Sequence, residues 1–429
     1  LFWYYHNILS AKVKETKICK IKQTIVLKCI DGILRAWYTF ICKVVRLMFK
    51  ACKFRLYPNR KQIELINKTF GSSRYVYNYY LYKMKNNGYV SAYTNIKDYT
   101  SNLKYDAVFL QEIDSIVIRE SLFNLDNAYQ KLFSKTGGYP KFKSKYNRNS
   151  YNTTAVYNSY KDKEYCNIEL DLINKQIKLP KLKWVNIRGY RNIDNINGKI
   201  KSVTISKESN GKYYVSVLYE MYDKVPSIKS RTIVGIDLGI KELLTLSDGT
   251  VYDNNKYIYK YTKRIKRKQR ELSRKEKGSK NYYKCKKELA ILHSKLANAR
   301  KFYTHKITKD ITDEYDIITC EKLKTKEMII KGKDNKLSIK INDATFSEII
   351  RQFQYKSKHK GKEFYQINTY YPSSQICSRC NNQDRRYKDL TRREYKCTKC
   401  NQEIDRDLNA SINIMFEGLK LYMKNYAKI

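Results

Sequence analysis

Four cysteines near the C-terminus have the spacing of a metal site. Cys377 and Cys380 form one CxxC pair, Cys397 and Cys400 form a second pair, and residues 381–396 separate them. Four thiolates at this spacing suit a tetrahedral zinc site that leaves no position open for a substrate. Two redox-active CxxC pairs are the alternative, but no thioredoxin-like sequence surrounds them. The sequence therefore predicts a structural zinc ion.

Three acids stand where predicted strands end or a predicted helix begins. Asp237 closes the apolar stretch 232–238, Glu321 closes the stretch 315–321, and Asp407 opens the last predicted helix, where it could serve as a cap. Two carboxylates about 4 Å apart repel by roughly 4 kcal/mol at an effective dielectric constant of 20. A divalent ion removes this cost, and oxygen ligands favour magnesium or manganese. A pair of such ions can hydrolyse a phosphodiester bond. Each acid taken alone is most simply a turn or cap residue.

Other catalytic chemistries find little support in the sequence. The histidines stand in basic or terminal contexts, and none is beside a candidate serine or cysteine nucleophile: His6, His293, His305 and His359. No glycine-rich phosphate loop occurs, which argues against nucleoside triphosphate hydrolysis. Three such acids in a very basic chain favour a metal-dependent nuclease.

The net charge indicates a polyanionic partner. Lysine and arginine number 87 against 41 aspartates and glutamates, which gives +46 at pH 7. Such an excess repels itself in a compact fold, so it usually accompanies nucleic-acid binding. A biased genome is the alternative, but that bias would enrich the acids as readily. The 41 tyrosines could stack on unpaired bases. Basic residues run through 141–147, 260–287, 322–340 and 351–362.

Strands and helices alternate in an order that could bring the three acids together at one edge of a sheet. Strands are expected at 51–57, 166–172, 176–179, 199–206, 212–220, 232–238, 315–321 and 363–369, with a hairpin over 241–253. The strands between 166 and 220 predict a small β-barrel. Helices are expected at 59–86 with an interruption at Gly71-Ser72, at 94–135, at 343–360 and 408–425, and as a basic hairpin over 258–312.

Residues 1–47 differ from the rest of the chain. They mix two of the three tryptophans with scattered charges and lack a clear period, whereas an alternating strand begins at Met48. We hypothesise that Met48 is the native start and that 1–47 is an upstream extension; a true N-terminal helical extension is the alternative. The most apolar stretch, 23–47, is broken by charges, so no membrane span is expected. The remaining cysteines lack disulfide spacing, which fits a reducing compartment such as the cytoplasm.

A series of short motifs resembles, in order, the motifs of one family. From Met48 onward the sequence is similar to the TnpB (OrfB) proteins, transposon-associated RNA-guided nucleases that resemble the type V CRISPR effectors. The motifs lie at 53–59, 71–78, 138–142, 179–182, 235–239, 321–323, 371–377 and 405–410. Each is modest alone, but their order is specific.

The resemblance implies a multidomain α/β fold. It implies an RNase H-like RuvC domain at 228–372 and 404–429, with a zinc ribbon inserted at 373–403. It also implies a wedge β-barrel at 48–58 and 136–227, which carries a helical recognition lobe at 59–135.

The resemblance also implies a reaction and partners. Asp237, Glu321 and Asp407 would form the catalytic triad and bind magnesium or manganese, while the four cysteines bind zinc. The partners would be a guide RNA from the transposon end and double-stranded target DNA, which is recognised beside a short transposon-adjacent motif and cleaved. The assembly would be a monomeric ribonucleoprotein. Whether Asp405 shares a metal stays open.

Candidate nucleic-acid contacts follow from the basic and aromatic residues in these segments. They are Arg74, Tyr75, Asn78, Tyr93, Arg119, Lys141, Lys143, Arg264, Arg267, Arg351 and Arg406. The knuckles depart from the family pattern, because Asn381 and Asn401 stand where a glycine commonly follows the CxxC pair. This change could loosen the turns but removes no ligand.

Two rival functions stay open. A guide-loaded DNA-binding regulator without cleavage would share the fold, but loss of an acid would favour it and all three acids are present. An unguided, structure-specific RuvC nuclease would share the triad but leave the wedge and recognition segments unexplained.

Overall fold

The computed structural model describes residues 45–146, 149–160, 163–189, 198–224, 231–254, 257–325, 327–328, 335–389 and 391–426. Nearly all of the proposed extension, 1–47, lies outside these residues. Apart from residues 45–48 and 221–224, the described residues belong to one of two compact units, which comprises Phe49–Glu220 and Pro226–Ile429. No helix among the described residues has the length and apolar character needed to span a membrane.

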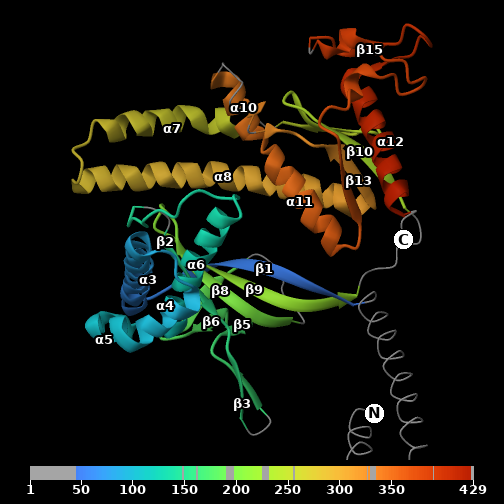
Figure 1. Ribbon diagram of the computed structural model, residues 1–429. Helices are drawn as coiled ribbons and strands as arrows, with labels where there is room; N and C mark the ends of the chain where they lie inside the picture. The colour runs from blue at the N-terminus through green and yellow to red at the C-terminus, as the bar shows by residue number, and fades with distance from the viewer. Residues whose placement is uncertain are drawn as a thin grey trace, which may run out of the picture. The chain divides into compact units, whose positions relative to one another are not determined.

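A seven-stranded sheet forms the centre of the N-terminal half (Figure 1). Its order is β2 (Asn149–Thr154), β8 (Gly198–Lys207), β9 (Tyr213–Lys224), β1 (Val45–Tyr57), β7 (Lys183–Arg188), β6 (Gln176–Leu179) and β5 (Glu169–Asp171). A separate hairpin pairs β3 (Tyr157–Tyr160) with β4 (Lys163–Cys166). Within the described residues, no hydrogen-bonded ladder joins the two edge strands β2 and β5. The sheet is therefore open there and does not close into the expected barrel. The sequence pattern missed β2, β3, β4 and β7.

Helices pack against this sheet and share its core. They are α3 (Arg60–Asn87), α4 (Ala92–Asp98), a π-turn (Tyr99–Leu103), α5 (Lys104–Asp106), a 3-10 turn (Val108–Glu112) and α6 (Ser115–Phe133). The interruption predicted at Gly71-Ser72 is wrong, because α3 runs through both residues. Residues 94–135 are helical over most of their length, as expected, although the segment divides into several short pieces before α6.

A five-stranded sheet forms the centre of the C-terminal half. Its order is β12 (Val251–Asp253), β11 (Glu242–Leu246), β10 (Ile233–Leu238), β13 (Ile317–Glu321) and β14 (Glu363–Ile367). The strands β10, β13 and β14 are parallel, whereas β11 and β12 are antiparallel. Parallel strands covered by helices are usually continuous apolar runs. The four buried residues of β13 fit that rule and explain why the sequence predicted this strand.

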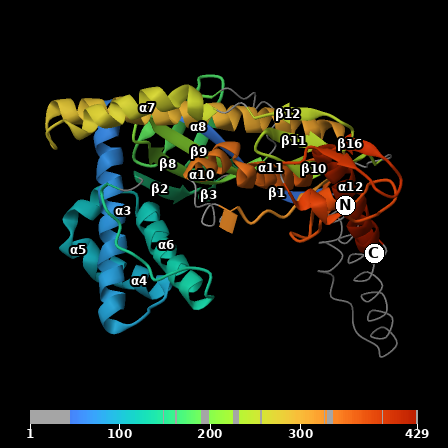
Figure 2. The same ribbon diagram turned by 90° about the horizontal axis from the view of Figure 1, so that it is seen from above.

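The C-terminal half also contains a basic helical hairpin and two shorter helices. The predicted basic hairpin is present as α7 (Tyr257–Ser273) and α8 (Lys280–Glu314), which lie side by side in both ribbon views (Figures 1 and 2). The helix expected over 343–360 is α11 (Phe346–His359), whereas α10 (Asn335–Ala344), which precedes it, was not predicted. They are separated at Thr345, whose φ of 54° is left-handed and cannot continue an α-helix.

The last described helix, α12 (Arg406–Tyr426), packs directly onto β10 and β13. A Cβ atom at Gly235 of β10 would lie 2.1 Å from the carbonyl oxygen of Ser411, and one at Gly418 of α12 would lie 2.1 Å from Cγ2 of Thr319. Only glycine permits so close an approach at either position. The helix therefore lies against the sheet nearly backbone to backbone, which fixes where its N-terminus falls.

Candidate active site and metal centre

Asp237 and Glu321 lie at neighbouring positions on two parallel strands. The register pairs Gly235 with Thr319 and Ile236 with Cys320, so the next residue on each strand is one of the two acids. Both acids come at the carboxyl ends of their strands, the edge at which open α/β sheets place their ligands. The sequence-based expectation of convergence thus has a structural basis in this register.

Asp407 belongs to the first turn of α12, but it does not cap the helix. The carboxylate of Asp405 accepts hydrogen bonds from the backbone N–H groups of Asp407 and Leu408, each at 2.9 Å. Asp405 is therefore the cap, and the prediction that Asp407 has this role is wrong. Both residues are acids at a helix start, so sequence spacing alone could not separate them. The cap leaves the carboxylate of Asp407 free for other contacts.

Two guanidinium groups contact the carboxylate of Asp407. Arg393, which precedes the second cysteine knuckle, lies 3.2 Å from Oδ2, and Arg406 lies 3.1 Å from Oδ1. Arg406 is buried, and it also donates to the carbonyl of Asp389. These two cations balance the charge of Asp407 within the protein.

The charges of Glu321 and Asp407 reach Asp237, which is partly buried near them. The pKa of Asp237 is raised to about 8, first by burial and then by the negative charges of Glu321 and Asp407. Burial also raises the pKa of Glu321, while the hydroxyl of Ser373, which donates to Oε1 of Glu321, opposes that rise. The cluster thus has an excess of negative charge in a partly desolvated position, which a cation would relieve.

The three carboxylates are ligands of the type that a hard divalent cation prefers, but their oxygen atoms do not converge on one point. In the described part of the chain, only the four cysteines bring three or more candidate ligand atoms within 4.8 Å of one another. Like charges repel, and Arg393 and Arg406 hold Asp407 in place. Carboxylate oxygens are nevertheless the donors that magnesium and manganese prefer.

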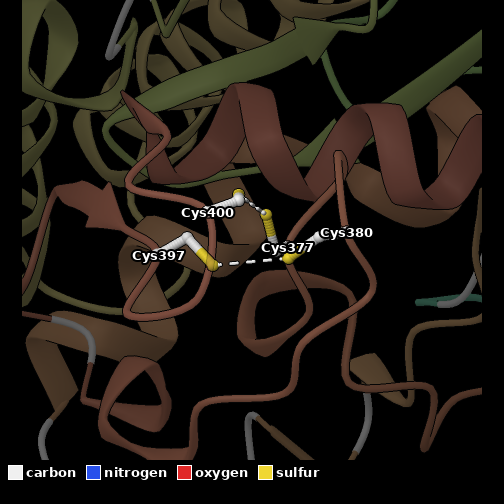
Figure 3. Close-up of side chains that lie close together, drawn as sticks. All are labelled: Cys377, Cys380, Cys397 and Cys400. Carbon is white, nitrogen blue, oxygen red and sulfur yellow. Dashed lines mark hydrogen bonds between the residues drawn. The ribbon is translucent and has the colours of Figure 1, made fainter.

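The four cysteines form a compact cluster at the tips of two loops (Figure 3). Sγ of Cys377 lies 3.6 Å from that of Cys400, and Sγ of Cys380 lies 3.5 Å from that of Cys397. A tetrahedral ion with zinc–sulfur bonds of about 2.3 Å requires sulfur atoms about 3.8 Å apart. Donor type, number and spacing therefore fit the predicted zinc.

The asparagines that replace glycine after each knuckle adopt left-handed conformations. The φ of Asn381 is 58° and that of Asn401 is 53°. Their N–H groups donate to the carbonyls of Cys377 and Cys397, at 2.9 and 3.0 Å. Asparagine enters this region more readily than most residues. Both turns are therefore closed, and the loosening considered from the sequence is not seen.

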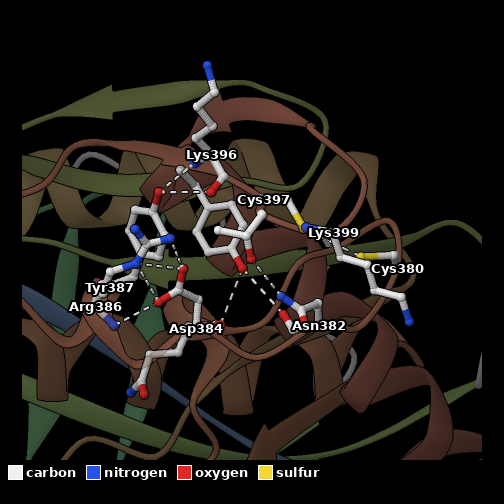
Figure 4. A network of polar contacts seen from close by, with 11 residues as sticks. Cys380, Asn382, Asp384, Arg386, Tyr387, Lys396, Cys397 and Lys399 are labelled. Carbon is white, nitrogen blue, oxygen red and sulfur yellow. Dashed lines mark hydrogen bonds and ion pairs between the residues drawn. The ribbon is translucent and has the colours of Figure 1, made fainter.

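Aromatic and polar contacts stiffen the loop between the knuckles (Figure 4). The hydroxyl of Tyr387 accepts from the N–H of Lys396 at 2.7 Å and donates to its carbonyl at 3.1 Å. The rings of Tyr387 and Tyr395 lie 4.2 Å apart. Arg386 forms an ion pair with Asp384 at 2.6 Å. The segment that contains Arg393 is thus anchored by its own small core.

The candidate nucleic-acid contacts divide by exposure. Exposed side chains include Tyr75, Tyr93, Arg119, Lys141, Arg264 and Arg267. Others have partners within the protein. The side chain of Asn78 forms hydrogen bonds with both backbone groups of Lys143, whose ammonium lies 3.7 Å from the centre of the Tyr77 ring. Arg74 donates a hydrogen bond to Asn149, and Arg351 forms an ion pair with Glu348. Burial lowers the pKa of Lys143 to about 8. The buried Arg406 belongs to the acidic cluster rather than to the exposed surface.

A basic groove along α7 and the two residues that follow it adds candidates that the motifs did not single out. Besides Arg267 it is lined by Lys263, Lys266, Arg270, Glu271, Arg274 and Lys275. A single helix with this many cations on its surface suits a phosphate backbone. Sequence reasoning identified the segment as basic but not which face of the helix carries the charge.

Two asparagines of α12 and Ser373 were missed as site residues. Asn409 and Asn413 are both buried and bond the backbone around the first knuckle. Their i, i+4 spacing on one helix face was the available signal.

Three family models match the chain. A model described as a probable transposase (OrfB of IS605) matches residues 216–331, a model described as a Cas12f1-like TNB domain matches 346–414, and a helix-turn-helix domain model matches 48–89. In the structure this last segment is the strand β1 followed by the uninterrupted helix α3. The first two models cover the three acids and all four cysteines.

Individual proteins are similar over most or part of the chain. "Putative RNA-guided DNA endonuclease InsQ" of Escherichia coli (strain K12) is 30% identical over 388 residues, which are 86% of this chain and 92% of InsQ. TnpB-like protein L79 of Acanthamoeba polyphaga mimivirus is 25% identical over 242 residues, which are 52% of this chain and 44% of that protein.

The fold resembles a solved structure. A Cas12f1 protein from a cryo-EM structure of a Cas12f1–sgRNA–target DNA complex aligns with a TM-score of 0.54 and 14% identity, over 86% of this chain and 99% of that chain. The α/β fold expected from the sequence is confirmed at the level of a TnpB- and Cas12f-like fold.

Proposed function

We infer the function of this chain from one premise: it belongs to the TnpB (OrfB) family, as its similarity to InsQ over most of both chains establishes. We propose that it is an RNA-guided DNA endonuclease encoded by an insertion-sequence-type transposon. It cleaves target DNA beside a short transposon-adjacent motif by metal-dependent hydrolysis. The observation that carries this proposal is the register that puts Asp237 and Glu321 at adjacent carboxyl ends of β10 and β13, with the charge of Asp407 in α12 also acting on Asp237.

The proposed catalytic residues are these three acids. Their carboxylates would hold magnesium or manganese, which would supply Lewis acidity and an activated water when bound. Asp237 and Glu321 provide ligands from adjacent strands, and Asp407 provides one from α12. Arg393 and Arg406 contact the carboxylate of Asp407 and hold it in place. The zinc bound by the cysteines is structural, because four protein thiolates leave no open position.

The proposed domains follow the sequence boundaries. Residues 228–372 and 404–429 form the RuvC-like nuclease, with the zinc ribbon 373–403 inserted; the parallel strands and α12 support this assignment. Residues 48–58 and 136–227 form the wedge, and 59–135 form the recognition lobe. We propose that a guide RNA from the transposon end and double-stranded DNA bind a single protein chain, with the α7 groove contacting phosphates. Guide pairing then supplies sequence specificity.

The test combines RNA identification with plasmid cleavage. The purified protein should carry a discrete RNA and cut a matching plasmid with magnesium. Asp237→Ala should abolish cutting and leave the bound RNA unchanged, because the acid contacts metal and not guide. Asp253→Ala is the control, since it removes an exposed aspartate from the same sheet. Cutting that survives Asp237→Ala would exclude the triad.

The rival functions give different outcomes in the same experiment. A discrete RNA and guided DNA binding without cutting, unchanged by Asp237→Ala, would favour the regulator. Cutting that ignores the guide would favour an unguided nuclease. Both outcomes overturn the proposal.

A further inference from the structure

The zinc ribbon is attached to α12 by two buried amides. Nδ2 of Asn409 donates to the carbonyl of Ile376 at 2.7 Å, and its Oδ1 accepts from the N–H of Ser378 at 2.9 Å. One turn later, Nδ2 of Asn413 donates to the carbonyls of Ile376 and Ser373, at 2.6 and 2.8 Å. Asn409 is 0% exposed and Asn413 is 2% exposed. The hydrogen bonds of both amides therefore hold the backbone on either side of Cys377.

The same contacts connect the ribbon to both ends of the acidic cluster. Asn409 stands two residues after Asp407 in α12, so the first knuckle is tied to the helix turn that carries this acid. Ser373, whose carbonyl is held by Asn413, donates its own hydroxyl to the carboxylate of Glu321. Ser373 is buried. The side-chain amide of Asn413 thus holds the backbone of Ser373, and the hydroxyl of Ser373 in turn orients the carboxylate of Glu321.

Simple packing does not require this arrangement. Burying an amide costs free energy unless its hydrogen bonds are made, and apolar residues of similar size would fill the same volume without that requirement. A network whose polar groups are all satisfied instead fixes one geometry. Residues that orient a metal ligand in this way commonly change metal affinity by about 10- to 100-fold when they are lost.

We propose that Ser373, Asn409 and Asn413 are positioning residues, which set the geometry of Glu321 and Asp407 from the first zinc knuckle. The ribbon is then part of the divalent-cation site, although its zinc is held by separate ligands. This inference rests on the proposed function, because it takes the acids as the ligands of that cation.

The test measures Mn²⁺ binding to the full-length, zinc-loaded protein by calorimetry, with no cleavage step. Ser373→Ala should weaken Mn²⁺ binding about tenfold, because Glu321 loses the hydroxyl that orients it. Ser373→Thr, which keeps a hydroxyl, should restore most of the affinity. The matched control is Ser374→Ala, the next serine of the same 3-10 turn, which should bind Mn²⁺ as the wild type does.

A second variant guards against local misfolding. Asn413→Leu removes both donors at similar volume and should weaken Mn²⁺ binding at least as much as Ser373→Ala does. Zinc content and thermal unfolding are measured on each variant. Unchanged Mn²⁺ affinity in zinc-loaded Ser373→Ala and Asn413→Leu overturns the inference, and so does an equal loss in Ser374→Ala.

The outcomes separate this inference from the proposed function. If the wild type shows no Mn²⁺ binding that Asp237→Ala abolishes, the acids are not a cation site and the proposed function fails. If the wild type shows such binding and the positioning variants match it, only the further inference fails.

Discussion

Asp405 and Asp407 stand two residues apart and have separate roles. Asp405→Ala should lower the free energy of unfolding by about 1 kcal/mol, because the first turn of α12 loses its cap. Mn²⁺ binding should persist in this variant. Asp407→Ala should do the reverse, with Mn²⁺ binding lost and the cap kept. Chemical denaturation and calorimetry check both variants, and an exchange of the two phenotypes would contradict the assignment.

The raised pKa of Asp237 predicts how pH acts on the metal-free protein. The unfolded chain loses this proton near pH 4, whereas the folded chain keeps it until about pH 8. The folded state therefore binds more protons between these values, and this group makes stability fall as pH rises across that window. Asp237→Asn should remove this part of the slope in denaturation experiments at several pH values.

Cation binding should show the opposite trend. A metal ion must displace the proton from Asp237, so Mn²⁺ affinity should rise from pH 6 to about pH 8 and then level off. Calorimetry in two buffers of different ionisation enthalpy should detect the released proton. An affinity that does not change over this range would argue against Asp237 as a ligand.

At the scale of single residues, the sequence predicted which side chains could bind a metal but not which other side chains contact them. The positions of Asp237 and Glu321 near strand ends were predictable because each acid follows a run of apolar residues. The contact of Arg393 with Asp407 was not predictable, since it depends on how the ribbon folds back. The role of Asn413 was hidden because a buried asparagine and an exposed one look alike in sequence.

Among the helices, two glycines should respond to alanine in opposite ways. Gly418→Ala places a Cβ atom 2.1 Å from Thr319, so α12 must move off the sheet and stability should fall by more than 1 kcal/mol. Gly71 lies inside α3 with nothing within 4 Å of its Cβ position, so Gly71→Ala should add about 0.5–1 kcal/mol. Urea denaturation of the two variants is the measurement. Stabilisation by Gly418→Ala would contradict the close packing of α12.

Element prediction worked where burial and period agreed. β10, β13, β14 and the α7–α8 hairpin were expected close to their observed bounds. The pattern failed for β2 and β7, which are half exposed and carry mixed residues, for the separate hairpin of β3 and β4, and for Gly71, where one helix continues through a weak helix former. The break at Thr345 needs a left-handed threonine, which no local signal announces.

The charge of the whole molecule makes nucleic-acid affinity dependent on salt. Each phosphate contacted on duplex DNA adds about −0.9 to the slope of log affinity against log salt. Arg267→Ala and Arg270→Ala, which alter the α7 groove, should each reduce the slope by up to about that amount. Lys309→Ala is the matched control, because it removes one charge from α8 that is paired with Asp313. Equal effects of all three variants would indicate net charge rather than the groove.

Because α12 follows β10 and β13 in the chain, the ribosome synthesises this helix after the strands that it covers. The acids span 170 residues (407 − 237), and synthesis from the N-terminus delivers β10 and β13 well before α12. Until that helix docks at Gly235, a nascent chain holds two of the three acids and an uncovered sheet face. Under the proposed function, a chain that ends before α12 lacks Asp407 and is therefore expected not to cut DNA.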